Sequence, residues 1–235
     1  MTSIRLYDLT LREDRRPSPF CWRAKYALAH KGLAFDAVPV AFTDIPTLFG
    51  GAYKTVPILE DGGKTVHDSW AIVDYLEEAY PDRPRIFGSR AERELCRFVD
   101  ASLSTSSARM PLFMCYAKDI HDYALEKDRD YFRKSREAWL GCTLEEACAG
   151  REERLDAARA GFEAVRLTLQ GGGPFLSGER PGYADYTVAS FLLWIASVGT
   201  VPLLRADDPL LPWFERVRDL YGGLGRTGPV NAIAG

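Results

Sequence analysis

Two dipeptides on either side of a short hairpin, Val56-Pro57 and Asp68-Ser69, have residue types that could hold a small peptide. Proline has no N–H to give to a sheet, so Pro57 in an apolar strand predicts an edge position or a special turn. We therefore expect a cis Val56–Pro57 bond. Such a bond would turn the N–H and C=O of Val56 outward, where they could pair with an extended peptide.

Asp68-Ser69 follows the hairpin and precedes a helical run in which Ser69 suits the N-cap position. The pair offers a carboxylate, a hydroxyl and the unpaired amides of a helix N-terminus. This combination suits a group that carries both an amine and a carboxylate. The plain alternative is an ordinary hairpin with a cis proline and a helix cap.

A second helix start lies at Ser18-Pro19, where serine suits the N-cap and proline the first turn. Cys21 lies one turn further and could itself be a reactive thiol. Cys21 holds the second-cysteine position of a Cys-x-x-Cys motif at this helix start. The first position of that motif is exposed at the helix N-terminus, while the second points into the domain, so we favour a buried, structural Cys21. The five cysteines and three histidines have neither a disulfide framework nor zinc spacing, and we expect reduced thiols and no metal site.

The elements that must position these residues read as strand, helix, strand, short irregular helix, hairpin and helix. This βαβ–ββα order predicts a thioredoxin-like α/β domain over residues 1–80. The expected spans are 4–9 and 35–40 for the first strands, 56–59 and 64–67 for the hairpin, and 18–31, 43–49 and 69–80 for the helices.

After a proline-bounded linker at 81–88, strand signals stop, and residues 89–235 predict an all-α domain. We expect a helix from residue 89 toward Met110 that Pro111 bends or ends. A capping box at Thr143 predicts one long helix to about residue 169. Further helices are expected at 186–198, apolar nearly all round, and at 210–220. The tract 102–107 is rich in hydroxyls, which is unusual inside a helix because short hydroxyls compete for the backbone. We favour a close-packed face there over a polar wall that lines a pocket.

The composition excludes several classes of partner. The 235-residue chain has a net charge of −3 with both signs interspersed, so it presents no basic field for nucleic acid or anionic lipid. The N-terminus lacks the apolar core of a signal peptide, and the most apolar run, 188–198, is too short to span a bilayer. We expect a cytoplasmic protein that binds a small molecule or a second copy of itself.

The paired dipeptides resemble the glutathione site of the glutathione transferases. The resemblance implies that Val56 and Pro57 hold the cysteinyl backbone of glutathione, that Asp68 and Ser69 hold its γ-glutamyl end, and that Thr55 lies beside the same peptide. The phrase Ser18-Pro19-Phe20-Cys21-Trp22-Arg23 is similar to the Cys-Pro-Phe-x-x-Arg opening of thiol-type members and glutaredoxins. Serine stands where those proteins have their nucleophilic cysteine.

That exchange implies a change of reaction class. A cysteine would form a mixed disulfide with glutathione, whereas Ser18 can only donate a hydrogen bond to the glutathione thiolate. A hydroxyl bond to a charged acceptor contributes about 1.5–3 kcal/mol and a helix N-terminus about 0.3–1. Together they would lower the thiol pKa from about 8.5 by roughly one to three units.

Four longer segments, beginning at Ser18, Val66, Ala184 and Asp207, resemble the bacterial β-etherase branch of this family. Those enzymes cleave the β-aryl ether bond of lignin-derived aromatic ketones by attack of the glutathione thiolate on the ether-bearing carbon. The resemblance therefore implies a small aromatic electrophile bound between the domains. Candidates for its slot are Tyr7, Trp22, Met110, Phe113 and Trp194, although for most of them we favour a role in core packing.

Other functions stay open on the sequence alone. The same scaffold could act on unrelated electrophiles as a general transferase or dehalogenase, or could bind glutathione without catalysis. The family resemblance also implies a homodimer. Asp100 could reach a neighbouring subunit's γ-glutamyl amine there, but we favour a solvated surface acid.

Overall fold

The computed structural model describes residues 3–235, except for the side chains of residues 106–108. Its sheet has the order β2-β1-β3-β4, with β1 parallel to β2 and antiparallel to β3. The strands are β1 (Ile4–Leu9), β2 (Phe35–Val40), β3 (Ile58–Asp61) and β4 (Lys64–His67). The predicted thioredoxin-like order is confirmed, but β3 starts later than expected, so Val56 and Pro57 lie in the turn before it.

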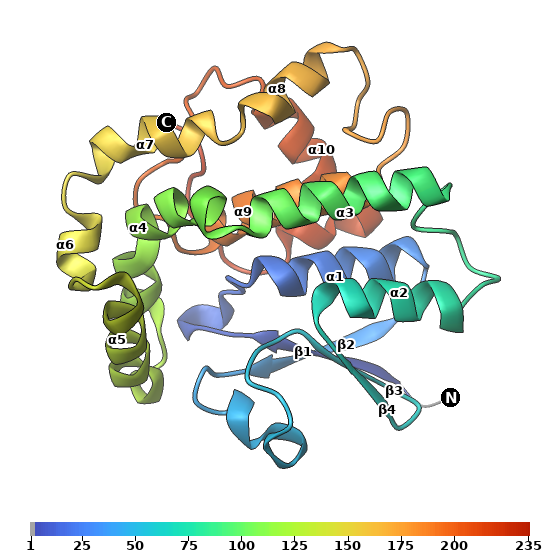
Figure 1. Cartoon of the computed structure of the whole chain (residues 1–235), viewed down its shortest axis with the longest axis horizontal. Coiled ribbons are helices and arrows are strands. Elements are labelled where there is room, and N and C mark those ends of the chain that lie inside the picture. The colour runs from blue at the N-terminus through green and yellow to red at the C-terminus, as the bar shows by residue number, and fades with distance from the viewer. Residues whose placement is uncertain (1–2) are drawn as a thin grey trace.

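Helices α1 (Pro19–His30) and α2 (Ser69–Ala79) cover one face of this sheet (Figure 1). Ser18 is the N-cap of α1, as predicted. The N-cap of α2 is Asp68 and not Ser69, because the Asp68 carboxylate accepts the amides of Trp70 at 2.9 Å and Ala71 at 3.1 Å. With Asp68 acting as the cap, the Ser69 hydroxyl is left for other partners.

The rest of the chain is helical. The helix expected from residue 89 ends at Ser104, with Thr105 as its C-cap, and Pro111 lies inside the next helix. Ser102 contributes to this break, since its hydroxyl bonds back to the carbonyls of Phe98 and Val99 and competes with the helix. The α-helices are α3 (Arg90–Ser104), α4 (Ser106–Tyr123), α5 (Glu126–Leu140), α6 (Leu144–Cys148), α7 (Arg151–Ala160), α8 (Glu163–Gln170), α9 (Tyr183–Val198) and α10 (Leu210–Gly223), and the 3-10 turns are Arg12–Asp14, Ile45–Gly51 and Leu224–Arg226.

The expected long helix from Thr143 is also wrong. Thr143 and Glu146 do form the capping box, but the segment divides into α6, α7 and α8. Gly150, with φ of 63°, lies in the left-handed region and ends the first piece. Residues 161–162 separate the second piece from the third.

The core is centred on α9, which is buried almost throughout, as its apolar sequence predicts. Helix α1 lies between the sheet and α9 (Figure 1), and Tyr26 of α1 stacks on Tyr186 of α9 with ring centres 5.1 Å apart. Asp185 is buried and accepts the Gly182 amide at 3.0 Å and the Trp213 indole N–H at 2.8 Å. Asp185 is therefore a structural acid in the first turn of α9.

One acid of α5 connects this helix to the α/β domain. Asp128 is buried and accepts the amides of Phe42 and Thr43, both at 2.9 Å, and the Thr43 hydroxyl at 2.6 Å. These bonds hold α5 beside the loop that follows β2 (Figure 1). Within residues 3–235, no helix is both long and apolar enough to cross a membrane.

Candidate active site

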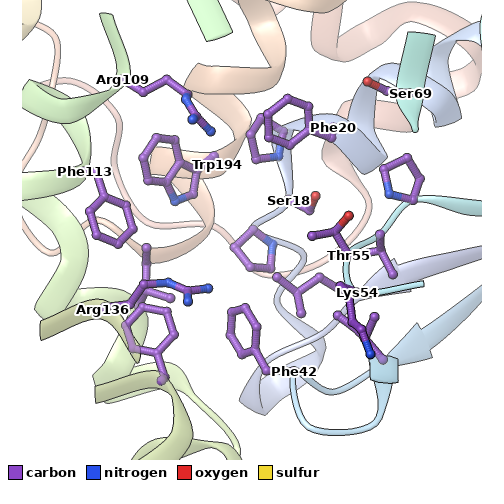
Figure 2. A pocket seen from close by; sticks show the side chains of 18 of the residues that line it. Ser18, Phe20, Phe42, Lys54, Thr55, Ser69, Arg109, Phe113, Arg136 and Trp194 are labelled. Carbon is purple, nitrogen blue, oxygen red and sulfur yellow. The ribbon is translucent and has the colours of Figure 1, made fainter. Parts of the chain in front are cut away.

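A cavity of about 450 Å³ opens between the α/β domain and helices α4, α5 and α9. Its floor contains Ser18 and the turns at residues 54–57 and 67–69. Its opposite wall is largely aromatic (Figure 2). The cavity therefore brings together all of the predicted glutathione-side residues, Ser18, Thr55, Val56, Pro57, Asp68 and Ser69.

Ser18 lies at the mouth of α1, facing the cavity. Its oxygen accepts the Cys21 amide at 3.2 Å, which leaves the hydroxyl hydrogen to be donated elsewhere. Cys21 is fully buried beneath it, among Tyr7, Val40 and Ile58, as expected for a structural cysteine. Burial raises the pKa of the Cys21 thiol far above its ordinary value, so this sulfur stays protonated.

The turn before β3 presents main-chain groups to the cavity. The Val56–Pro57 bond is cis, as predicted. In the described chain, neither the N–H nor the C=O of Val56 pairs with another main-chain group. The Thr55 side chain is exposed and its hydroxyl lies 2.8 Å from Nε2 of His67. An extended peptide could therefore pair with Val56 at this turn.

The start of α2 forms the second polar patch. Asp68 has φ of 82°, an unfavourable backbone conformation for a residue other than glycine and one often found at functional sites. Ser69 is 3% exposed, and among residues 3–235 neither its hydroxyl nor its amide has a hydrogen-bond partner. The Ser69 groups and the second oxygen of Asp68 are thus available to an amine and a carboxylate.

The opposite wall holds two of the five predicted second-substrate residues. Phe113 of α4 and Trp194 of α9 line the cavity with ring centres 6.3 Å apart. Trp139 of α5 meets Phe113 edge-on at 5.1 Å. Phe42 and Phe132 extend the same aromatic surface toward the α/β domain.

The other three candidates do not line the cavity. Tyr7 packs against Phe49 and donates to Glu60 at 2.9 Å. Trp22 is buried and donates its indole N–H to the Arg16 carbonyl at 2.8 Å. Met110 is absent from the lining although its neighbour Arg109 takes part. These predictions are corrected because an aromatic or soft side chain at the right place in the sequence can equally serve the core.

Asp100 is also placed differently from our expectation. It is buried and forms an ion pair with the buried Arg23 of α1, which also bonds the Ser190 hydroxyl at 3.2 Å. Burial of both partners shields this pair from water, so Asp100 is not a solvated surface acid. The pair instead joins α3 to α1.

Several lining residues were not predicted from the sequence. Phe20 lies inside the Ser-Pro-Phe phrase and could have been found there. Lys54 and His67 adjoin the predicted Thr55 and Asp68 and could likewise have been found from the sequence. The others depend on how α4, α5 and α9 approach the α/β domain, which no local pattern reveals. They include Phe42, Arg109, Tyr131, Phe132, Arg136, Trp139 and Phe191.

Comparison with known proteins assigns the chain to a family. The family model described as "Glutathione S-transferase, N-terminal domain" matches residues 14–84, and the one described as "Glutathione S-transferase, C-terminal domain" matches residues 98–201. The probable glutathione S-transferase GSTU6 of Oryza sativa subsp. japonica is 28% identical over 221 residues, which are 86% of this chain and 80% of that protein.

Solved structures agree with this result. Glutathione transferase GSTFuA3 from Phanerochaete chrysosporium is 27% identical with a TM-score of 0.71, over 95% of this chain and 93% of that one. Glutathione S-transferase CsGST83044 of Ceriporiopsis subvermispora, solved in complex with glutathione, is 26% identical with a TM-score of 0.72, over 96% of both chains. The chain has the glutathione transferase fold, glutathione is its co-substrate, and it belongs to the glutathione S-transferase superfamily.

Proposed function

We propose that this transferase cleaves β-aryl ether bonds of aromatic ketones by displacement with the glutathione thiolate. One observation carries the proposal: a serine hydroxyl at the mouth of α1 faces an aromatic slot across a single cavity. A thiolate held at Ser18 would meet an aryl substrate packed against Phe113 and Trp194. The likeness to bacterial β-etherases in the sequence is the further support for this substrate class.

In the proposed complex each polar patch has one task. Val56 pairs with the cysteinyl backbone of glutathione, with Pro57 fixing the turn and Thr55 beside it. Asp68 and Ser69 bind the γ-glutamyl amine and carboxylate at the start of α2, where the unpaired amide of Ser69 favours an anion. Ser18 donates its hydroxyl to the sulfur and stabilises the thiolate.

The reaction needs no redox partner. The thiolate attacks the carbon next to the ketone, a C–S bond forms, and the C–O bond to the aryloxy group breaks. A phenolate leaves with the bonding electron pair and takes up a proton from water. The chain stabilises the glutathione thiolate, aligns it with the carbon and provides an aromatic slot, which together suffice because the neighbouring ketone activates the carbon.

Steady-state release of phenol from a β-aryl ether ketone tests this function. Ser18→Ala should lower kcat/KM at neutral pH by roughly tenfold to a hundredfold, since about 1.5–3 kcal/mol of thiolate stabilisation is lost. The pH–rate profile should shift upward by about one to two units. If wild type conjugates a chloronitrobenzene but releases no phenol, the protein is a general transferase, and glutathione binding without any turnover would contradict catalysis altogether.

A homodimer and a cytoplasmic location belong to the same proposal. Leu95 and Phe98 of α3 are 67% and 71% exposed, which is unusual for large apolar side chains and suits burial against a second copy. The five cysteines are free, as in a reducing compartment. Sedimentation equilibrium of the purified chain would give a dimer mass, and a monomer mass would overturn the assembly.

A further inference from the structure

Two arginines of the helical domain line the second-substrate side of the cavity. Arg109 comes from α4 and Arg136 from α5. In Figure 2 both guanidinium groups point into the cavity, with the rings of Phe113 and Trp194 between them. A cation on each side of an aromatic slot is unexpected for a site that holds only a neutral aryl ketone.

Arg136 is half-buried among uncharged groups. Its guanidinium carbon lies 5.0 Å from the ring centre of Phe132 and 5.7 Å from that of Phe42, and one nitrogen donates to the Ser135 hydroxyl at 3.0 Å. Burial lowers the pKa of Arg136, and of its neighbours only the Tyr131 hydroxyl opposes this shift. In the described chain no carboxylate pairs with it.

Arg109 is also without an anionic partner in the part of the chain that the structure describes. Its Nε atom is buried and has no hydrogen-bond partner. Its guanidinium carbon lies 5.9 Å from the ring centre of Phe20, at the weak end of a cation–π contact. The group therefore retains unused donors beside the cavity.

Three arginines enclosed elsewhere in the chain are neutralised by acids. Arg23 pairs with Asp100, Arg151 with Asp119 at 2.9 Å, and Arg166 with Asp208 at 2.7 Å. Such pairing is the usual condition for withdrawing a guanidinium from water. Arg109 and Arg136 depart from this pattern, and both line the cavity.

We propose that Arg109 and Arg136 bind a carboxylate carried by the aromatic electrophile whose ring lies against Phe113 and Trp194. A guanidinium presents paired donors that match a carboxylate, and a site partly closed to water strengthens that bond. Asp68, which also lines the cavity, belongs to the glutathione side. The inference rests on the aromatic second substrate of the proposed function and adds that this substrate carries a negative charge.

Binding of 2-naphthoate and of 2-naphthamide to protein saturated with S-methylglutathione tests this without turnover. The two probes share a ring system and differ in charge, and titration calorimetry measures both. We expect wild type to prefer the carboxylate by at least about tenfold. Arg136→Met and Arg109→Met should each weaken naphthoate binding by roughly tenfold to a hundredfold and leave naphthamide nearly unchanged.

Two further variants make the result specific. Lys134→Met removes an exposed cation from the same helix and should leave both affinities unchanged. Arg136→Lys keeps the charge but loses the paired donors, so its affinity for naphthoate should lie between those of wild type and Arg136→Met. A misfolded protein would not show such an intermediate affinity. Each variant is first checked for wild-type affinity for S-methylglutathione.

Equal affinity of wild type for the two probes would overturn the proposal. A loss of S-methylglutathione affinity in the arginine variants would also overturn it, because the cations would then serve glutathione. Because the binding assay involves no reaction, its result can be interpreted even if the protein does not cleave the ether. Conversely, if wild type prefers naphthamide but still cleaves the ether, the proposed carboxylate on the substrate is rejected and the proposed function stands.

Discussion

The two halves of the cavity are built from different kinds of sequence. The glutathione half comes from two short segments, 55–57 and 68–69, together with Ser18, and its groups are main-chain amides, helix starts and hydroxyls. The second-substrate half comes from the consecutive helices α4 and α5 together with α9, which lies much later in the chain, and it uses aromatic rings and two arginines. One half depends on local backbone geometry and the other on how whole helices pack.

This difference explains why the two halves can vary independently. A turn and two helix N-termini keep their geometry whatever side chains surround them, so they suit an invariant co-substrate. A wall of side chains on separate helices can change its shape and charge one residue at a time. Substitutions confined to one half measure how separate the two halves are.

The largest effect is expected from Asp128→Ala, which removes the acceptor of three hydrogen bonds from Phe42 and Thr43. Leaving these donors unpaired should lower the free energy of unfolding by about 2–4 kcal/mol. The shift of α5 should raise KM for the aromatic electrophile, while the affinity for S-methylglutathione stays the same. Urea denaturation and calorimetry measure the two quantities.

Asp130→Ala is the matched control for that variant, because Asp130 is exposed on the same helix. It should change neither stability nor binding. An equal loss of glutathione and electrophile binding in Asp128→Ala would show that the halves are coupled and would break the comparison.

A smaller effect, on the glutathione half of the cavity instead of the second-substrate half, is expected from Ser69→Ala. Loss of one hydroxyl bond to the γ-glutamyl carboxylate should weaken glutathione binding by about 1.5–3 kcal/mol, roughly tenfold to a hundredfold. Naphthoate binding should be retained. Calorimetric titration with S-methylglutathione measures the change, and wild-type affinity in this variant would remove Ser69 from the site.

The smallest effect is expected from Cys21→Ala. This thiol is fully buried, and the burial that raises its pKa keeps it protonated and unreactive at neutral pH. The free energy of unfolding should fall by about 1 kcal/mol for the lost packing, with kcat/KM unchanged. Abolished turnover would show that Cys21 and not Ser18 is the reactive position.

Features that depend on local backbone geometry could be predicted from the sequence, and those that depend on the packing of whole helices could not. The Ser18 cap, the cis bond before Pro57 and the order of the strands follow from local rules about proline, hydroxyls and alternation. The cap at Asp68 was missed because aspartate and serine suit that position about equally.

Features that join distant segments were not predicted. Asp100 was expected in solvent because its partner Arg23 lies 77 residues away. Asp128 and the two cavity arginines look like ordinary charges of helical surfaces until α4 and α5 are placed. The break at Thr105 depends on serine back-bonding that competes closely with a continuous helix.

Burial of Cys21 one turn below Ser18 also bears on how the protein withstands oxidation. The sulfur that reacts in the proposed chemistry arrives with the co-substrate, and the nearest resident sulfur is closed off from peroxides and disulfides. Oxidative stress should therefore slow turnover by depleting reduced glutathione and should leave the Ser18 site chemically intact. Activity at this site would return as soon as the glutathione pool is reduced again, with Cys21 unchanged.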